Sequence, residues 1–217
     1  MKNKEINALH NVDEVITLNM KDTNLLKKEL KNMFIRTISP YFDNYNSVKR
    51  ENIGPNIIYF GAMSRPENYN SAIWFIKHVL NKLPDIFKFI IIGNSPDESL
   101  LKFRNERVVV TGYIDNIVPY LETALCFAAP IIMGAGIKIK ILEAMSAGLP
   151  VLTNDFGIEG IPAKNEKDYI HCSTPEDYIN AVIMLSTDLE KNRQIGLKSK
   201  QFIIQNFNYE NCSYVNT

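Results

Sequence analysis

The glycines between Ala129 and Gly160 are the residues whose type and spacing best suit a chemical task. Gly134 and Gly136 form a short loop directly before a helical pattern, in the run APIIMGAGIKIKILEAM. A glycine loop in this position lets backbone N–H groups approach an anion, and the N-terminus of the helix adds partial positive charge. The loop therefore predicts a cradle for a phosphate group.

Two lysines follow in the first turn of that helix. The helix dipole disfavours Lys138 and Lys140 there unless an anionic ligand or a nearby carboxylate compensates them, so the pair indicates a diphosphate. Glu143 comes three residues after Lys140, close to the same face, where its carboxylate can accept hydrogen bonds from a ribose diol. The alternative is an ordinary strand–helix unit with solvated lysines, because glycine-rich loops are common in α/β folds.

Short apolar runs alternate with helical patterns from about Pro55 onward, and these elements must position the loop. Strands are predicted at 56–61, 88–93, 107–113, 125–130, 150–154 and 168–172. Helices are predicted at 68–85, 96–104, 116–124, 137–147, 175–186 and 189–207. Thr174 is expected to cap the helix that begins at residue 175, with Asp177 at its third position. The alternation is typical of an α/β fold, a Rossmann-like parallel sheet with helices on both faces.

The first fifty residues follow a different pattern. They predict a helix, a strand near 13–19, a helix at 19–30 and a strand near 34–40, followed by a polar stretch. These elements are too few for a domain, so residues 1–50 are interpreted as the end of a preceding α/β domain, with a linker near 42–54. Residues 51–207 are expected to form the second domain and residues 208–217 a tail.

Composition and charge exclude several classes of protein. Of the 217 residues, 46% are apolar and 22% charged, as in a globular protein with a substantial core. Lys+Arg and Asp+Glu both number 24, so no nucleic acid is expected as a partner. Three separated cysteines without a C-x-x-C pair predict reduced thiols.

Hydropathy gives an expectation about localisation. The start of the chain lacks the apolar segment of a signal peptide, and no window nears the roughly 20 apolar residues of a spanning helix. We therefore expect a cytoplasmic protein. The lysines of residues 24–32 are expected to be solvated or to touch anionic lipid, as peripheral contact with the inner face of the plasma membrane.

Residues 134–160, GAGIKIKILEAMSAGLPVLTNDFGIEG, resemble the signature of glycosyltransferase family 4 (group 1), in which L-E-A-M-x-x-G-x-P-V precedes a strand that ends near E-G. GAMSRPENYNSAIWF, IIIGNSP and VVVTGYIDNIVPYL follow the family's order, so the resemblance covers about residues 56–207. It implies a GT-B enzyme whose C-terminal domain binds a nucleotide sugar and which retains anomeric configuration. It also implies that no metal or other cofactor is needed, and the D-x-D motif of the metal-binding GT-A enzymes does not occur in the sequence.

Carried over residue by residue, the resemblance implies catalytic roles for Arg65, Lys140 and Glu143. Glu143 matches the second glutamate of the family's E-x(7)-E pattern, expected on the ribose, and basic side chains stabilise the departing diphosphate. The backbone at Tyr113 and Ile114 is expected to pair with the base edge, while the Tyr113 ring either stacks on the base or caps the sheet. The full set expected to bind the donor is Gly61, Arg65, Gly93, Tyr113, Ile114, Gly134, Gly136, Ile137, Lys138, Lys140 and Glu143.

Two positions depart from the family pattern. The first glutamate of E-x(7)-E falls on Ala135, which leaves open how the sugar hydroxyls are recognised. Ala62 stands where many members have arginine, and Arg65 is the nearest cation that can replace it. The chain also resembles a subgroup that reads G-x-G-x-K-x-K, in which Lys138 and Lys140 supply the missing positive charge.

The resemblance thus implies a hexosyltransferase that uses a UDP-sugar and a glycan or lipid-linked acceptor in surface polysaccharide or lipopolysaccharide biosynthesis. A truncated, non-catalytic nucleotide-sugar-binding module is the alternative, because the sequence encodes little of an acceptor domain. A GT-B sugar-nucleotide epimerase would need carboxylates and histidines around the sugar, and the sequence shows no such cluster.

Overall fold

The computed structural model describes residues 2–207, and the expected tail at 208–217 lies outside the described residues. The chain divides into two compact units, with a boundary between Tyr41 and Phe42. Phe42–Asn206 form the larger unit, and the preceding residues form the smaller one together with Phe207.

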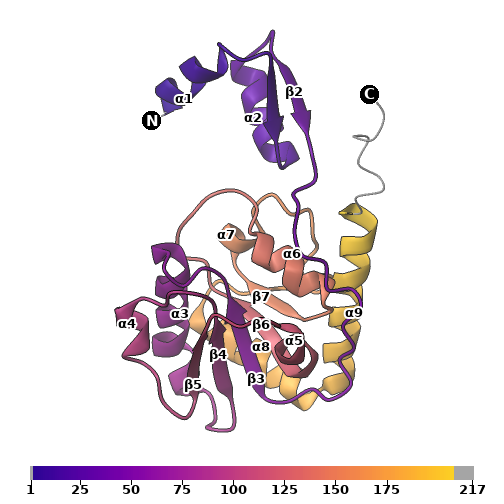
Figure 1. Ribbon diagram of the computed structural model, residues 1–217. Helices are drawn as coiled ribbons and strands as arrows, with labels where there is room; N and C mark the ends of the chain where they lie inside the picture. Colours follow the sequence, from indigo (N-terminus) through magenta and orange to yellow (C-terminus); the bar gives the residue numbers. More distant parts are fainter. Residues whose placement is uncertain (1, 208–217) are drawn as a thin grey trace. The chain divides into compact units, whose positions relative to one another are not determined.

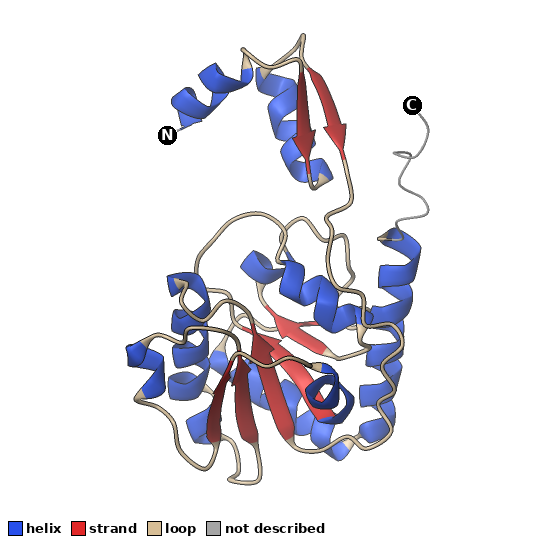
Figure 2. Ribbon diagram, viewed as in Figure 1, coloured by secondary structure: helices blue, strands red, loops and turns tan. Residues whose placement is uncertain are grey.

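The larger unit is built on a six-stranded sheet in the order β5-β4-β3-β6-β7-β8, with every neighbouring pair parallel. The strands are β3 (Asn56–Phe60), β4 (Lys88–Ile92), β5 (Val108–Gly112), β6 (Ala124–Ala129), β7 (Val151–Thr153) and β8 (Ile170–His171). Helices lie on both faces of this sheet (Figures 1 and 2). The strands β3, β4 and β6 are almost wholly buried and read as continuous apolar runs, which is why they could be predicted. The expected Rossmann-like fold is confirmed.

The helices of the larger unit also follow the predicted order. They are α3 (Pro66–His78), the 3₁₀ turn η1 (Leu80–Lys82), α4 (Glu98–Leu101), α5 (Val118–Thr123), α6 (Ile139–Ser146), α7 (Asp155–Ile158), α8 (Pro175–Thr187) and α9 (Leu189–Asn206). The capping box expected of Thr174 and Asp177 is present at α8. The short α7 was not predicted, and it forms because the Asn154 side chain accepts a hydrogen bond from the Gly157 N–H.

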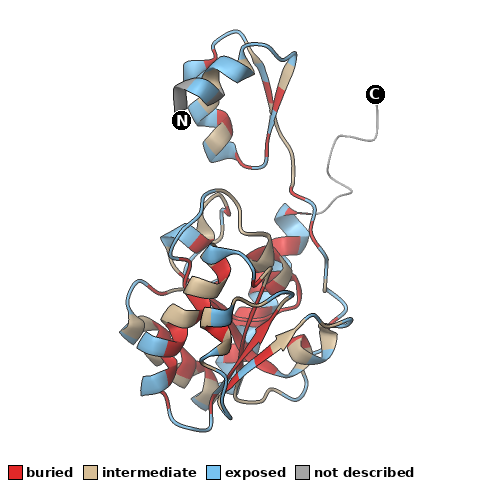
Figure 3. Ribbon diagram, turned by 60° about the vertical axis from the view of Figure 1, so that its left-hand side comes forward, coloured by how far each residue is buried: buried red, intermediate tan, exposed pale blue. Residues whose placement is uncertain are grey.

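Aromatic side chains fill the core between the sheet and its helices. Phe75 of α3 packs on Phe89 of β4, with ring centroids 4.6 Å apart, and Tyr59 of β3 lies 5.7 Å from Phe127 of β6. Figure 3 shows the buried residues concentrated along the strands and the inner sides of the helices. This packing fixes the carboxyl ends of β3, β4 and β6, on which the site described below depends.

The polar stretch before β3 belongs to the larger unit. The Tyr45 N–H donates to Ser146 Oγ at 2.9 Å, and the Arg50 guanidinium donates to the carbonyls of Gly148 at 2.8 Å and Ala124 at 2.6 Å. The unit therefore begins at Phe42, earlier than the domain boundary expected near residue 50. The predicted boundary was later because these hydrogen bonds join residues far apart in the sequence, and a polar stretch gives no sign of them.

The smaller unit contains α1 (Lys2–Leu9), β1 (Glu14–Thr17), α2 (Met20–Glu29) and β2 (Phe34–Thr37). The two strands pair in parallel, and Val15, Leu30 and Ile35 form a small core. Ile16 and Phe34 are exposed, because a two-stranded sheet with two short helices cannot cover all its apolar side chains. Among the described residues of both units, no helix is long and apolar enough to cross a bilayer.

Candidate functional site

The strand order reverses between β3 and β6. After β3 the chain moves outward to β4 and β5, and it then returns to the other side of β3 to form β6. In open parallel sheets, ligands bind in the crevice that this reversal opens outside the carboxyl ends of the strands. Gly61 directly follows β3, and the loop that carries Gly134 and Gly136 follows β6, so both lie at this crevice.

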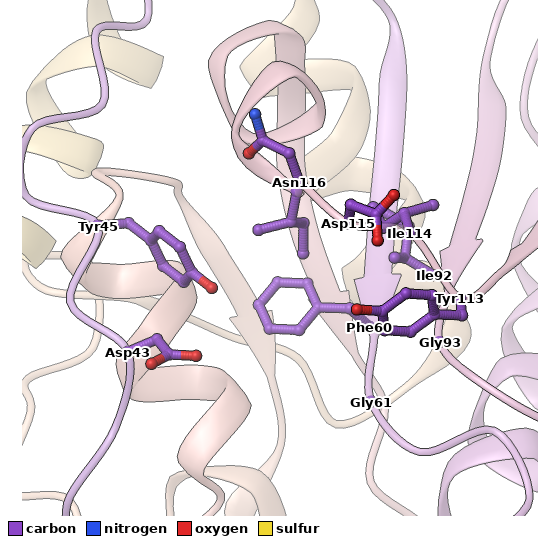
Figure 4. A pocket seen from close by; sticks show the side chains of 11 residues that line it. Asp43, Tyr45, Phe60, Gly61, Ile92, Gly93, Tyr113, Ile114, Asp115 and Asn116 are labelled. Atoms are coloured by element: carbon purple, nitrogen blue, oxygen red, sulfur yellow. The ribbon is translucent and has the colours of Figure 1, made fainter.

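One cavity of about 360 Å³ lies at the carboxyl ends of β3, β4 and β5. Figure 4 shows Asp43 and Tyr45, from the segment before β3, facing Phe60 at the end of that strand. Aromatic rings beside polar groups suit a planar heterocycle with hydrogen-bonding edges. The lining residues are Asp43, Tyr45, Phe60, Gly61, Ile92, Gly93, Tyr113, Ile114, Asp115, Asn116 and Ile117.

Gly93 is required for the shape of this cavity. A Cβ atom at Gly93 would lie 1.8 Å from the carbonyl oxygen of Gly61, so any side chain there would push the ends of β3 and β4 apart. Its φ of 154° also disfavours any other residue. The predicted position of Gly93 in the site therefore has a steric reason.

A second cavity of about 370 Å³ opens between the β3–α3 loop and the loop before α6. It shares Gly61 with the first cavity, so the two adjoin at the reversal of strand order. Its lining brings together cations that lie far apart in the sequence, Arg65 on one side and Lys138 and Lys140 on the other. The full lining is Gly61, Ala62, Arg65, Glu67, Asn68, Ile131, Met133, Gly134, Ala135, Ile137, Lys138, Ile139, Lys140 and Glu143.

The two helices that begin at the second cavity both have cations as N-caps. Arg65 caps α3 and Lys138 caps α6, and neither makes a side-chain cap hydrogen bond. Cations are the least favourable residues at the positive end of a helix, where Asp, Asn, Ser or Thr are preferred. An anion bound in the cavity would compensate both helix ends.

The helix with the lysines begins at Ile139, two residues later than predicted. Gly134 and Gly136 have φ values of 104° and 75°, as expected for a glycine loop. Gly134 and Ile137 line the second cavity, but Gly136 does not. Its N–H instead donates to Glu159 Oε2 at 3.2 Å, so a carboxylate of the chain already receives one N–H of the predicted cradle.

Lys140 has the most unusual environment of the cations. Its Nζ donates to the Tyr59 hydroxyl at 2.9 Å and to Asn68 Oδ1, and it lies 4.7 Å from the centroid of the Tyr59 ring. Burial lowers the pKa of Lys140 to about 8. A partly desolvated ammonium group held by neutral oxygens keeps its charge available for an anionic ligand.

Glu143 lies on α6 near the junction of the two cavities. Burial raises the pKa of Glu143, and a hydrogen bond from the Asp43 backbone opposes this effect. Asp43 lines the first cavity and Glu143 the second, so the carboxylate is placed between the expected positions of a base and a diphosphate. The contact of Glu143 with a ribose stays a prediction.

Several residues of the site were not predicted. Asp43 and Tyr45 fall in a stretch interpreted as a linker. Asn68 was predicted only as part of a helix, and Tyr59, which contacts Lys140, only as part of a strand. Their place in the site depends on how the segment before β3, β3, α3 and α6 pack together. Among the described residues, no group of three or more His, Cys, Asp or Glu side chains is placed to hold a metal ion.

The fold defines a Rossmann-like domain of GT-B type, with two adjoining cavities at the reversal of strand order. Residues 54–188 match the family model of the group 1 glycosyl transferases, which is more than half of the chain. The chain belongs to this family, as its sequence motifs implied.

A relative from Klebsiella pneumoniae, described as an uncharacterized 44.6 kDa protein in the cps region, is 24% identical over 193 residues, which are 83% of this chain and 50% of the relative. A mutant of S. aureus TarM, solved with fondaparinux, alpha-GlcNAc-glycerol and UDP, superposes with a TM-score of 0.78 at 19% identity, over 96% of this chain and 44% of TarM. Anabaena HepE, solved with UDP and glucose, gives a TM-score of 0.77 at 14% identity, over 95% of this chain and 62% of HepE. The chain thus spans about half the length of the curated relative it matches.

Proposed function

We propose that this chain binds the nucleoside diphosphate of a UDP-sugar, with the base in the first cavity and the diphosphate in the second. The observation that carries the proposal is the junction of the two cavities at Gly61, where an aromatic pocket adjoins a pocket with three cations. Aromatic rings beside polar groups in one cavity and a cluster of cations in the other match a molecule with a planar base at one end and a diphosphate at the other. TarM and HepE, which share the fold, were both solved with UDP.

In sugar transfer, negative charge develops on the diphosphate as it leaves the sugar. Arg65, Lys138 and Lys140, together with the first turns of α3 and α6, would stabilise that charge without a metal ion. Preorganised cations act most strongly here because the site is partly shielded from water. We therefore propose a metal-independent glycosyltransferase, and retention of anomeric configuration is proposed from the resemblance to family 4 alone.

The acceptor is proposed to be a glycan or a lipid-linked glycan of surface polysaccharide assembly. The relative from the cps region supports this assignment. A cytoplasmic protein with peripheral membrane contact, as expected from the sequence, is the corresponding proposal for localisation. The alternative from the sequence, a module that binds a nucleotide sugar without transferring it, has the same donor site.

The test is calorimetric titration of the full chain with UDP, GDP, ADP and dTDP in the presence of EDTA. We expect UDP to bind selectively, and adding Mg²⁺ should leave its affinity unchanged. A folded sample that binds none of the four nucleotides would refute the donor site. Sugar release from a UDP-sugar, measured in parallel, separates a transferase from a module that only binds.

A further inference from the structure

We propose that Asn68 is a positioning residue of the phosphate site, whose side-chain amide joins Lys140 to the loop that carries Arg65. This inference rests on the proposed function, because it concerns the cations assigned to the diphosphate. It assigns a role to a residue that the sequence presents only as part of a helix.

The contacts of Asn68 connect the two sides of the second cavity. Asn68 is 6% exposed, in the first turn of α3. Its Oδ1 accepts a hydrogen bond from Lys140 Nζ, while its Nδ2 donates to the carbonyl of Ala62 at 2.9 Å. One planar amide therefore fixes both the ammonium group from α6 and the backbone of the β3–α3 loop.

Tyr59 completes this arrangement from the sheet. Its buried hydroxyl lies 2.9 Å from Lys140 Nζ and 3.4 Å from Asn68 Oδ1. Lys140 thus has two neutral oxygen partners supplied by β3 and α3. Because both partners are uncharged, they orient the ammonium group without neutralising it. A carboxylate at position 68 would form an ion pair with Lys140 and repel a phosphate.

The charged groups that act on Lys140 come from the start of α3 and from α6. Glu67 and Glu143 favour its charged form, whereas Lys138 and Arg65 disfavour it, as does burial, which is the largest effect. A hydrogen bond from the ammonium group to Asn68 also favours the charged form. Replacing Asn68 should therefore change the protonation of Lys140 in a direction that depends on the substitute.

Two variants make this prediction specific. Asn68→Ala removes a neutral acceptor and should lower the pKa of Lys140, whereas Asn68→Asp adds a negative charge and should raise it. Both should weaken UDP binding by about tenfold or more and uridine binding much less, because only UDP carries the phosphates. Lowering the pH should partly restore UDP binding in Asn68→Ala but not in Asn68→Asp.

The experiment measures Lys140 directly. The full chain is acetylated with limiting acetic anhydride at pH values from about 6.5 to 10, roughly the range over which a shifted lysine titrates. Peptide mass spectrometry then gives the extent of acetylation of Lys140 at each pH, and from it the apparent pKa. Calorimetry with UDP and with uridine gives the affinities. Asn70→Ala, an asparagine two positions further along α3 and outside both cavity linings, is the matched control.

Opposite shifts of the Lys140 pKa in the two variants, with the selective loss of UDP and an unchanged control, would support the role of Asn68. Unchanged Lys140 titration in both variants, or equal losses of UDP and uridine, would overturn it while leaving the proposed function in place. If the wild-type chain bound no UDP, the proposed function would fall and the role of Asn68 in a phosphate site with it. Asn68→Asp preserves the size of the side chain, so it decides the question if Asn68→Ala does not fold.

Discussion

At the scale of single residues, the site depends on charges placed where they do not stabilise the free protein. Arg65 and Lys138 occupy helix N-caps that favour oxygen side chains, and Lys140 is largely removed from water. Residues that cost stability commonly serve binding or catalysis. The environment of Lys140 leads to one prediction about the proposed donor and one about the stability of the free protein.

The affinity for UDP should depend on the protonation of Lys140. Because the phosphates bind the charged form of Lys140, affinity should fall by up to tenfold per pH unit above about 8, the pKa of Lys140 in the unliganded chain. It should be highest near about pH 7, because at lower pH the terminal phosphate of UDP itself takes up a proton. Calorimetry across this range tests the slope, and Lys140→Met should abolish it. A wild-type slope that persisted in Lys140→Met would assign the titration to another group.

The same pKa shift predicts how the stability of the free protein depends on pH. The pKa of Lys140 in the folded chain lies below its ordinary value of 10.5, so between about 8 and 10.5 the unfolded chain binds more protons. The free energy of unfolding of the wild-type chain should therefore increase as the pH rises through this range. Lys140→Met should lack this increase. Urea denaturation of both chains at pH 7.5 and 10 would measure the difference.

Glu143 should act on the ribose rather than on the phosphates. Glu143→Gln should weaken the binding of UDP and of uridine equally, by about 1–3 kcal/mol, because both ligands carry the ribose diol. The circular dichroism spectrum should stay unchanged. The matched control is Glu98→Gln, an exposed glutamate on α4 outside both cavity linings. A loss confined to UDP would place Glu143 on the diphosphate instead.

At the scale of elements, the segment 42–50 shows how an irregular stretch becomes part of a site. Arg50 donates hydrogen bonds to the carbonyls of Gly148, Ala124 and Leu125 and to the Asn192 side chain. It thereby links the segment to the turn after α6, the start of β6 and α9. The same segment supplies Asp43 and Tyr45 to the first cavity.

Replacing Arg50 should therefore affect both stability and binding. Arg50→Ala leaves buried carbonyls without their donor and should lower the free energy of unfolding by about 3 kcal/mol. Uridine affinity should also decrease, because the lining from residues 43–45 loses its anchor. Urea denaturation and calorimetry measure the two effects, with Arg104→Ala as the control at an exposed arginine. Wild-type stability in Arg50→Ala would show that the anchor contributes little.

At the scale of the whole molecule, the chain consists of two units with unequal cores. Every residue that lines the two cavities lies within Phe42–Asn206, which also holds the six-stranded sheet. The smaller unit has a core of a few apolar side chains around Val15 and Ile35. The larger unit should therefore carry the donor site by itself.

A fragment that comprises residues 42–206 should fold cooperatively and bind UDP with the affinity of the full chain. Its sheet is complete, and its buried aromatic core does not use the smaller unit. Thermal denaturation and calorimetry of the fragment and the full chain provide the comparison. An affinity reduced by more than about tenfold, a free-energy difference of roughly 1.4 kcal/mol, would show that the smaller unit contributes to the site.

The sequence by itself determined the order of the strands and helices along the chain. It also identified the loop with Gly134, Lys138 and Lys140 as a candidate binding site. Apolar runs such as IIYF and FIII predict buried parallel strands because neither face can hold polar residues. Gly134 was identifiable because a glycine loop before a helix suits an anion, and Lys138 and Lys140 because lysine is unfavourable at the start of a helix. Local patterns report local structure well.

Only the tertiary structure decided which distant residues share the site. Arg65 and Lys140 line one cavity because β3 and β6 are neighbours at the reversal of strand order, and nothing near either residue encodes that pairing. The contact between Asn68 and Lys140, and the return of Asp43 to the end of β3, arise in the same way. Contacts between residues far apart in the sequence depend on how the sheet is assembled, which a local pattern does not specify.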